Sequence, residues 1–150
     1  MKDKPTVYLD DLAIGQTFVS ATHQLDQEQI VEFASRYDPQ PFHIDAKAAE
    51  GTSFRGLAAS GWQTTAITMR LLVDSLRISD GIIGMGAEIE WPRPTRPNDC
   101  LQVVTKVTDI RSSRSKPDRG IVTLECLTKN QHGEICQRLV TKVFVMRRPA

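Results

Sequence analysis

The sequence predicts an α+β fold, in which helices are followed by an antiparallel sheet. Two observations lead to this prediction: a long apolar helical segment at about 62–76, and four later segments rich in Val, Ile, Leu and Thr. These strand-like segments cover 82–90, 101–111, 121–128 and 135–146, and turn-like residues join them. Their order favours an antiparallel meander of four strands, and the long helix is the only predicted element apolar enough to cover one face of it.

A strand and a short helix are expected in the first part of the chain. Residues 18–25 are strand-like. Asp26 then has the character of a helix N-cap, with Gln29 three residues later as its capping-box partner. Apolar residues follow at helical spacing and stop before Asp38, because Pro39 disfavours helical geometry in the residue before it. We therefore expect a short helix that carries Asp38 at its C-terminal end.

A second short helix and the long helix follow. Residues 45–50 are helical in character, and Asp45 can cap them. The long helix carries a broad apolar stripe, which predicts near-total burial and consists of Ala66, Met69, Leu72, Val73 and Leu76. Ser60 can cap this helix, and Gly61 lets a ligand approach the backbone closely. The N–H groups at its start suit a carbonyl oxygen or an anion, although a tight turn that needs small side chains explains both residues equally well.

The segment 38–43 is the most informative part of the chain. Asp38 and His43 lie five residues apart, with Pro39 and Pro41 between them. Each proline restricts its own φ and the residue before it, so we expect a stiff extended loop. A carboxylate and an imidazole at a fixed separation suit general acid–base catalysis on one water molecule or one reacting carbon. Both residue types are also common in loops without a catalytic role, so the spacing alone leaves both interpretations open.

Length and composition narrow the class of protein. The 150 residues carry 19 Lys and Arg against 18 Asp and Glu, a net charge of +1, which gives no reason to expect a nucleic acid or an anionic membrane as partner. No apolar run approaches the ~20 residues of a membrane span, and no apolar signal core follows residues 1–5. We therefore expect one domain, residues 1–150, in a soluble and cytoplasmic protein.

The cysteines and the other histidines predict no metal site. Cys100, Cys126 and Cys136 are odd in number and form no C-x-x-C pair, so neither a disulfide framework nor structural zinc is expected. Cys126 and Cys136 lie in strand-like runs, where we expect them to be buried as small hydrophobic residues. His23 and His132 are expected to be ordinary sheet and turn residues.

The motifs and the order of elements resemble a known family. Residues 38–45 read Asp-Pro-Gln-Pro-Phe-His-Ile-Asp. The MaoC-like dehydratases and (R)-specific enoyl-CoA hydratases have Asp, a variable residue, Asn, Pro, an apolar residue, His, a variable residue and an acid. Gly61 matches the family's glycine before its long helix, and residues 94–99 resemble its Pro-rich entry to the next strand. The resemblance covers nearly the whole chain and implies the hot-dog fold, a curved antiparallel sheet wrapped around one long central helix.

The resemblance also implies a role for each site residue. Asp38 and His43 would form a catalytic dyad that holds the water added to, or removed from, the β-carbon of an acyl-CoA. The backbone N–H of Gly61 would bind the thioester carbonyl oxygen, where enolate charge develops. Gln40 stands in place of the family's Asn and keeps the amide on a longer side chain. Ser60 stands where the family often has His.

Other residues near the predicted site have weaker assignments. Phe42 and Trp62 flank the site and could shape an acyl pocket, although core packing explains each of them as well. Basic residues at 111–119 and at 147–148 could meet the phosphates of coenzyme A, although a solvated basic loop is the simpler interpretation.

The resemblance therefore predicts an (R)-specific enoyl-CoA hydratase or 3-hydroxyacyl-CoA dehydratase. It would need no metal and no cofactor, since coenzyme A enters as part of the substrate. A homodimer or a higher even oligomer is expected, because hot-dog domains usually pair their sheets edge to edge; neither nucleic acid nor a membrane is expected as partner. Two alternatives stay open: an acyl-CoA thioesterase on the same fold and a non-catalytic acyl-CoA-binding subunit. The pair Asp38 and His43 favours the hydratase over both.

Overall fold

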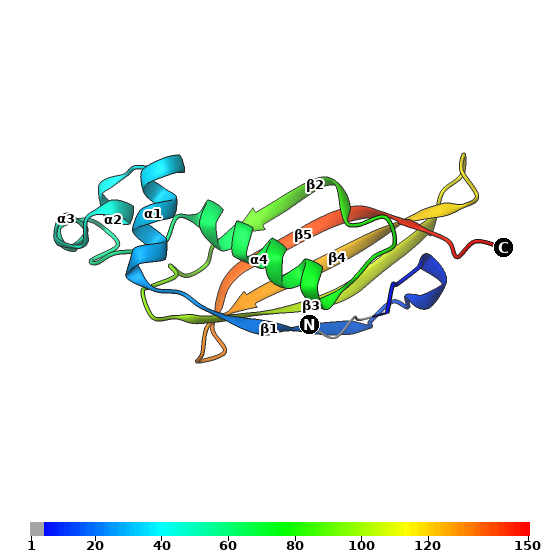
Figure 1. The fold of residues 1–150 in the computed structure, drawn as a ribbon, viewed down its shortest axis with the longest axis horizontal. Helices are drawn as coiled ribbons and strands as arrows, with labels where there is room; N and C mark the ends of the chain where they lie inside the picture. Colours follow the sequence, from blue (N-terminus) through cyan, green and yellow to red (C-terminus); the bar gives the residue numbers. More distant parts are fainter. Residues whose placement is uncertain (1–4) are drawn as a thin grey trace.

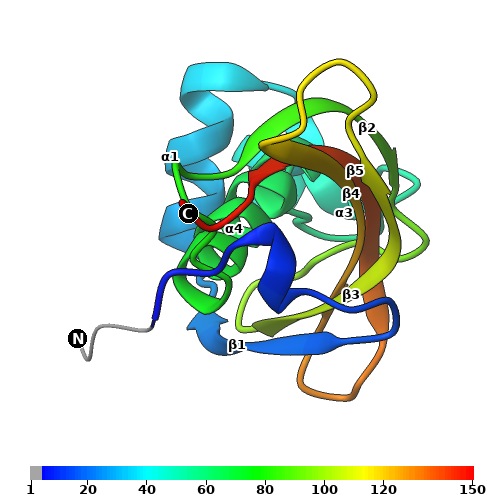
Figure 2. The same ribbon diagram turned by 90° about the vertical axis from the view of Figure 1, so that its right-hand side faces the viewer.

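The computed structural model describes residues 5–150. Residues 1–4 lie outside the described residues, and they belong to the N-terminal segment in which no signal sequence is expected. Over 5–150 the chain forms a five-stranded antiparallel sheet that curves around one long helix, α4 (Gly61–Ser75) (Figures 1 and 2). The strands are β1 (Thr17–Gln24), β2 (Ile83–Glu90), β3 (Cys100–Ser112), β4 (Arg119–Lys129) and β5 (Ile135–Met146), and a short 3-10 helix, η1 (Leu9–Asp11), precedes them. This arrangement confirms the predicted α+β class and the hot-dog fold.

The strand order β1-β3-β4-β5-β2 corrects the predicted four-strand meander. β3, β4 and β5 pair in sequence order as expected, but β2 pairs with β5 at one edge, and β1 pairs with β3 at the other. The physical reason is the connection between β2 and β3. Residues 91–99 contain three prolines, so this segment is too long and too stiff for a tight hairpin. It instead carries the chain across the end of the sheet.

The main core lies between the C-terminal half of α4 and the sheet. Three leucines of this region, Leu71, Leu72 and Leu76, are almost completely buried. They pack in one cluster with apolar residues of the three central strands, which include Val103, Val107, Val122, Leu124, Val143 and Val145. Cys126 and Cys136 are fully buried as predicted. Burial of each large aliphatic side chain contributes roughly 1.5–3 kcal/mol, so this cluster is the main source of stability.

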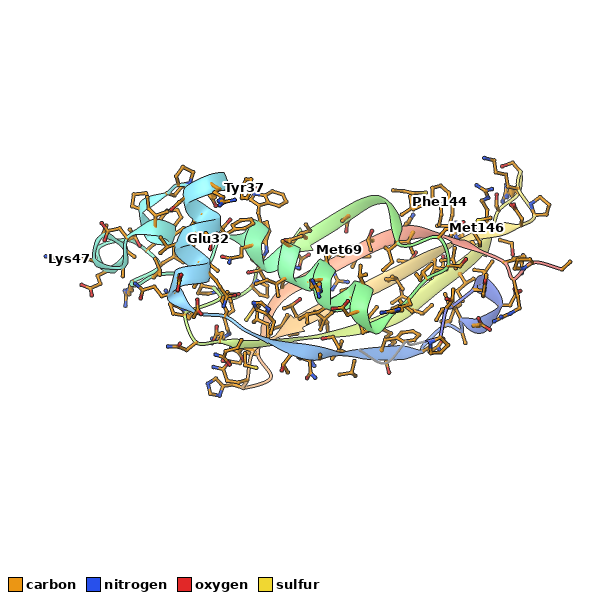
Figure 3. All side chains as sticks on the ribbon, in the orientation of Figure 1. Glu32, Tyr37, Lys47, Met69, Phe144 and Met146 are labelled. Carbon is orange, nitrogen blue, oxygen red and sulfur yellow. The ribbon has the colours of Figure 1, made fainter. Side chains whose placement is uncertain are left out.

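α4 is less completely buried than its apolar stripe predicts. Met69 and Val73 are 42 % and 41 % exposed, although both belong to the stripe, and Figure 3 shows Met69 partway along the helix. Gln63, Thr64 and Thr68 are buried instead. Helical spacing defines a stripe but not the direction in which the sheet lies. Polar side chains can face the interior here because most of them form hydrogen bonds there.

Three short helices gather at the end of the sheet where α4 begins (Figure 1). They are α1 (Gln27–Tyr37), α2 (Pro41–Ile44) and α3 (Ala46–Glu50). Asp26 caps α1 by accepting the N–H of Gln29, and Asp45 caps α3 by accepting the N–H of Lys47, as predicted. The expected capping box is incomplete, because the side chain of Gln29 donates to the carbonyl oxygen of Gln24 instead. No helix within residues 5–150 is both long enough and apolar enough to cross a membrane.

α2 corrects the expected extended loop. Residues 41–44 form one helical turn with Pro41 at its first position, where the fixed φ of proline fits a helix and its missing N–H is not needed. Asp38 and Gln40 keep non-helical backbone geometry, with ψ of 65° and 148°, as the following prolines require. In Figure 3, Tyr37 and Lys47 mark this end of the molecule, and the opposite end contains Phe144 and Met146.

Candidate active site

Asp38 and His43 come together where α1, α2 and α4 meet. Asp38 follows the last residue of α1, and His43 lies in α2. The Nε2 atom of His43 is 3.3 Å from Oδ2 of Asp38, and both side chains are largely buried. The helical turn of α2 brings His43 back toward Asp38, five residues earlier in the chain. A fully extended segment of this length would hold the two Cα atoms much farther apart.

The hydrogen bonds of His43 determine which ring nitrogen faces Asp38. Nδ1 lies 2.6 Å from the carbonyl oxygen of Ala58. A carbonyl oxygen can only accept, so Nδ1 carries a proton and Nε2 is the nitrogen that can exchange one. The rings of Phe42 and Phe54 pack against the imidazole, with centroids 4.5 and 5.9 Å away. The imidazole is thus held from the backbone side and presents Nε2 to the carboxylate.

Three groups act on the carboxylate of Asp38. Gln40 Nε2 donates to Oδ1 at 2.5 Å, and Ser60 Oγ donates to Oδ2 at 2.7 Å. Partial burial raises the pKa of Asp38, but the hydrogen bonds from Gln40 and Ser60 and the charge of His43 outweigh this effect, so the pKa lies below its usual value. Asp38 is therefore ionised at neutral pH. Gln40, which replaces the family's Asn, reaches the carboxylate with its longer side chain.

Ser60 and Gly61 bring the start of α4 to Asp38. Ser60 is fully buried and caps the helix as predicted, because its Oγ accepts the N–H of Trp62 at 3.3 Å. Within residues 5–150 no acceptor is hydrogen-bonded to the N–H of Gly61, which lies at the positive end of this 15-residue helix. The structure also supplies a second reason for glycine here. The indole of Trp91 occupies the space that a side chain would need, since a Cβ on Gly61 would lie 2.6 Å from Cε2 of the ring.

A pocket of about 280 Å³ connects these groups. Asp38, His43, Gly61 and Trp62 line it, so four of the predicted site residues share one cavity. The remaining three predicted residues do not line the cavity: Gln40 and Ser60 donate hydrogen bonds to Asp38, and Phe42 packs against Phe54. Among these three, Phe42 is the one without a direct contact to the carboxylate. Its ring supports His43 and Phe54 rather than the cavity itself.

The rest of the pocket wall comes from residues outside the predicted site. They are Phe54, Ala59, Thr64, Trp91, Arg93, Pro94 and Thr95. Four of them belong to the Pro-rich connection 91–99, which the sequence motif identifies only as the entry to β3. An aromatic and a basic residue inside a proline-rich loop are a usable signal, because prolines restrict the backbone that carries these side chains. Phe54 lies in an irregular loop and carries no such signal.

Arg96 ties the loops around the pocket together. Its guanidinium donates to three backbone carbonyl oxygens, those of Phe54, Gly56 and Leu57. The next residue, Ala58, carries the carbonyl group that holds the imidazole. The planar guanidinium offers several N–H donors in fixed directions, so one side chain can hold three carbonyl groups at once. Arg96 therefore links the Pro-rich connection to the segment that orients the dyad.

The basic clusters that the sequence offered for coenzyme A lie away from the pocket. The 111–119 segment forms the β3–β4 hairpin, at the end of the molecule opposite α1–α3 (Figure 1). Arg119 pairs there with Asp118, and Arg147 pairs with Asp10. These ion pairs favour the simpler interpretation of a solvated basic surface. In the described part of the chain no three His, Cys, Asp or Glu side chains gather where they could hold a metal ion.

Comparison with known proteins identifies the family. The model of the MaoC-like domain matches residues 11–130, which is most of the chain. The chain belongs to the MaoC-like domain family. A crystal structure of a MaoC-like dehydratase from Rhodospirillum rubrum is 54 % identical in sequence, with a TM-score of 0.94 over 96 % of this chain and 99 % of that one. The predicted MaoC-like family is thus confirmed.

Two further relatives extend the comparison of this MaoC-like chain. The uncharacterised protein YdeM of Bacillus subtilis is 34 % identical over 126 residues, which are 82 % of this chain and 87 % of that protein. An R-hydratase from Pseudomonas aeruginosa has the same fold, with a TM-score of 0.78 at 22 % identity, over 95 % of this chain and 88 % of that one. At that identity the likeness shows the shared fold alone.

Proposed function

We propose that this MaoC-like chain is an (R)-specific enoyl-CoA hydratase and, in the reverse direction, a 3-hydroxyacyl-CoA dehydratase. One observation carries the proposal: a single pocket is lined by Asp38, His43 and Gly61. A hydratase needs a proton-transfer group beside the β-carbon and a hydrogen-bond donor at the thioester oxygen. The carboxylate–imidazole pair suits the first task, and the N–H at the start of α4 suits the second. Membership of a hydratase and dehydratase family supports this assignment.

The proposed hydration divides the work between these two parts. The water oxygen bonds to the β-carbon, the double bond shifts, and negative charge develops on the thioester oxygen. The N–H of Gly61 stabilises that charge, and loss of one such donor in other enzymes costs about 2.7–4 kcal/mol. One proton leaves the water and one proton reaches the α-carbon, so the net change is the addition of one water molecule. Dehydration runs through the same steps in reverse.

The dyad acts as one proton-transfer unit in this mechanism. Because Nδ1 of His43 donates a hydrogen bond to the carbonyl oxygen of Ala58, only Nε2 can exchange a proton with the water. Nε2 and Oδ2 of Asp38 lie 3.3 Å apart, close enough for one water molecule to contact both. Gln40 donates to Oδ1 of the carboxylate and Ser60 donates to Oδ2, which limits its reorientation. The proposed steps use these groups and water, and coenzyme A takes part as the carrier of the acyl group.

One assay tests this proposal against both alternatives. The purified chain is incubated with crotonyl-CoA, and the loss of enoyl absorbance, the release of free thiol and the configuration of the product are followed. Hydration to the (R)-3-hydroxy product without thiol release supports the proposal. Thiol release identifies a thioesterase, and tight binding with neither reaction identifies a non-catalytic subunit. An (S) product contradicts the proposed stereochemistry.

We also propose that the chain forms a homodimer through β2. This strand lies at the edge of the sheet described for residues 5–150, and its apolar residues Ile83 and Met85 are exposed. An open, apolar strand edge favours pairing with another chain. Light scattering should then give twice the mass of one chain. Met85→Lys should shift the protein toward the monomer, whereas a wild-type mass equal to one chain contradicts the proposal.

A further inference from the structure

Trp91 contacts the first turn of α4 next to the proposed thioester site. A Cβ on Gly61 would lie 2.6 Å from Cε2 and 2.8 Å from Cζ2 of the indole, so the ring packs directly on the Gly61 backbone. The ring of Trp62 meets that of Trp91 edge-on, with centroids 5.7 Å apart and an angle of 79°. Both rings line the pocket. Trp91 thus forms the part of the pocket wall that packs on Gly61, whose N–H is proposed to bind the thioester oxygen.

Gln137 on β5 holds the indole of Trp91 in this position. Its side chain is completely buried, and its Oε1 accepts from Trp91 Nε1 at 2.9 Å and from Thr65 Oγ1 at 2.8 Å. Its Nε2 donates to Thr68 Oγ1 at 3.1 Å, and Thr68 in turn shares a hydrogen bond with Thr128. Both ends of the amide therefore have partners on α4. Because they do, the amide cannot rotate without losing hydrogen bonds, and the carbonyl end stays directed at the indole.

The two tryptophans of the pocket differ in how they are held. An indole nitrogen can only donate, so a buried acceptor determines the plane and direction of the ring. Trp91 has such an acceptor and is 43 % exposed. Trp62 is 59 % exposed, and its indole nitrogen forms no hydrogen bond with any residue that the structure describes. Trp91 is therefore the fixed aromatic wall of the pocket, and Trp62 is the more exposed and less constrained of the two rings.

We propose that Trp91 determines acyl-chain specificity and that Gln137 is the residue that positions it. The pocket of about 280 Å³ must accept the reacting end of the thioester together with the acyl group. This volume lies just below the roughly 300–1,000 Å³ of pockets for drug-sized ligands, so we expect a short acyl group. A fixed ring beside Gly61 cannot move aside for a longer chain. This inference rests on the proposed hydratase function and names its substrate class.

The test compares a short and a long substrate in variants of Trp91 and Gln137. In wild type, kcat/KM should be higher for crotonyl-CoA than for trans-2-octenoyl-CoA. Trp91→Leu should raise the ratio of octenoyl to crotonyl kcat/KM at least about tenfold, within the range that one or a few methylene groups are worth in an apolar pocket. Gln137→Leu should shift the ratio in the same direction by a smaller factor. An unchanged ratio in Trp91→Leu overturns the proposal.

Thr128→Val is the matched control for Gln137→Leu. It removes a buried hydrogen bond from the same network but has no contact with the indole. Both variants should melt at a lower temperature than wild type, and only Gln137→Leu should change the ratio. Equal changes of the ratio in both would mean that general loosening, not the position of Trp91, sets specificity. If Gln137→Leu does not fold, Trp91→Phe, which keeps a ring and loses the N–H, replaces it and should shift the ratio upward.

Binding measurements separate this inference from the proposed function. Dissociation constants of the unreactive butyryl-CoA and octanoyl-CoA are measured for wild type and Trp91→Leu. The variant should gain affinity for octanoyl-CoA relative to butyryl-CoA by a similar factor. If wild type hydrates no enoyl-CoA but the ratio of dissociation constants shifts, the hydratase proposal is wrong and the proposed role of Trp91 is supported. If wild type hydrates crotonyl-CoA and neither ratio shifts, the proposed role of Trp91 is wrong and the hydratase proposal is supported.

Discussion

The two halves of α4 bury different kinds of side chain. In the first half and at the midpoint, Gln63, Thr64 and Thr68 are buried, and in the second half the large buried side chains are those of Leu71 and Leu72. The polar half lies beside the pocket and the apolar half lies over the main core. One rigid helix therefore joins a site that needs directed hydrogen bonds to a core that needs close packing. Substitutions at the two ends should separate activity from stability.

The largest expected effect is on the dyad next to the polar half. Asp38→Asn and His43→Ala should each lower kcat for crotonyl-CoA hydration by about a hundred- to ten-thousandfold, because each removes one member of the proton-transfer unit. Asp38→Asn should melt only slightly below wild type at neutral pH, since this residue lies outside the main core but its ionised form contributes to stability. His43→Ala removes a buried ring and should melt somewhat lower. Near-normal turnover in either folded variant would contradict the proposed mechanism.

The opposite pattern is expected in the apolar half. Leu72→Ala should lower the free energy of unfolding by about 2–5 kcal/mol, because it opens a cavity in the core. Turnover per folded molecule should stay near wild type, as measured at a temperature where the variant is folded. Arg70→Ala on the exposed side of the same helix is the control, and it should change stability by less than about 0.5 kcal/mol. A large loss of kcat in Leu72→Ala would mean that the two halves are not separable.

Gly61→Ala tests the junction between the helix and the wall. The new methyl group would overlap the Trp91 ring, and such overpacking typically costs about 1–3 kcal/mol of stability. The displaced ring or helix start should also lower kcat. Gly51→Ala is the matched control, because a Cβ there would meet its nearest atom at an ordinary 3.8 Å. Combining Gly61→Ala with Trp91→Leu should recover part of the lost stability, and no recovery would exclude the ring as the cause.

The smallest expected effect is that of Ser60→Ala. Loss of the cap should cost about 0.5–2 kcal/mol of stability. Loss of the hydrogen bond to Asp38 should also raise the pKa of that carboxyl toward its ordinary value of about 4, because the bond holds the pKa down. The acid limb of kcat/KM, measured across pH 3–6, should therefore move to higher pH.

The stability effect of Asp38 has a defined sign. Its folded-state pKa lies below the unfolded value, so the ionised group stabilises the fold above about pH 4, and this contribution is lost as the pH falls through the folded value. In Ser60→Ala the two values lie closer together, and the contribution is smaller. Melting curves across the same pH range should show a shallower acid decline than in wild type. A steeper decline would contradict the assigned role of Ser60.

Local signals predicted the elements, and distant contacts decided their arrangement. Asp26 and Asp45 cap their helices as expected, because a cap depends on residues only a few positions away. The strand 135–146 has the predicted bounds. The predicted partner of β2 was wrong, because alternation of side chains indicates a strand but not the strand that pairs with it. Pro41 was assigned to an extended loop although it begins a helical turn, a position where proline is common.

Only part of the candidate site was predictable from the sequence. The sequence motif selected Asp38, His43 and Gly61, and the structure brings them to one pocket. It did not select Trp91 or Gln137, which contact each other across 46 positions of the chain. A buried glutamine in a strand has no periodic signal of its own. Its importance depends on the indole that the folded chain places beside it.

The position of Gln137 on β5 also has a consequence for folding. Asp38 directly follows α1 and His43 lies in α2, two helices formed by local contacts that assemble quickly, whereas β5 must pair with β4 and with the distant β2. During synthesis the chain exposes the dyad long before β5 leaves the ribosome. The indole of Trp91 acquires its acceptor only after that strand has joined the sheet. A fully formed pocket is therefore a late event, and its appearance can serve as a reporter of completed folding.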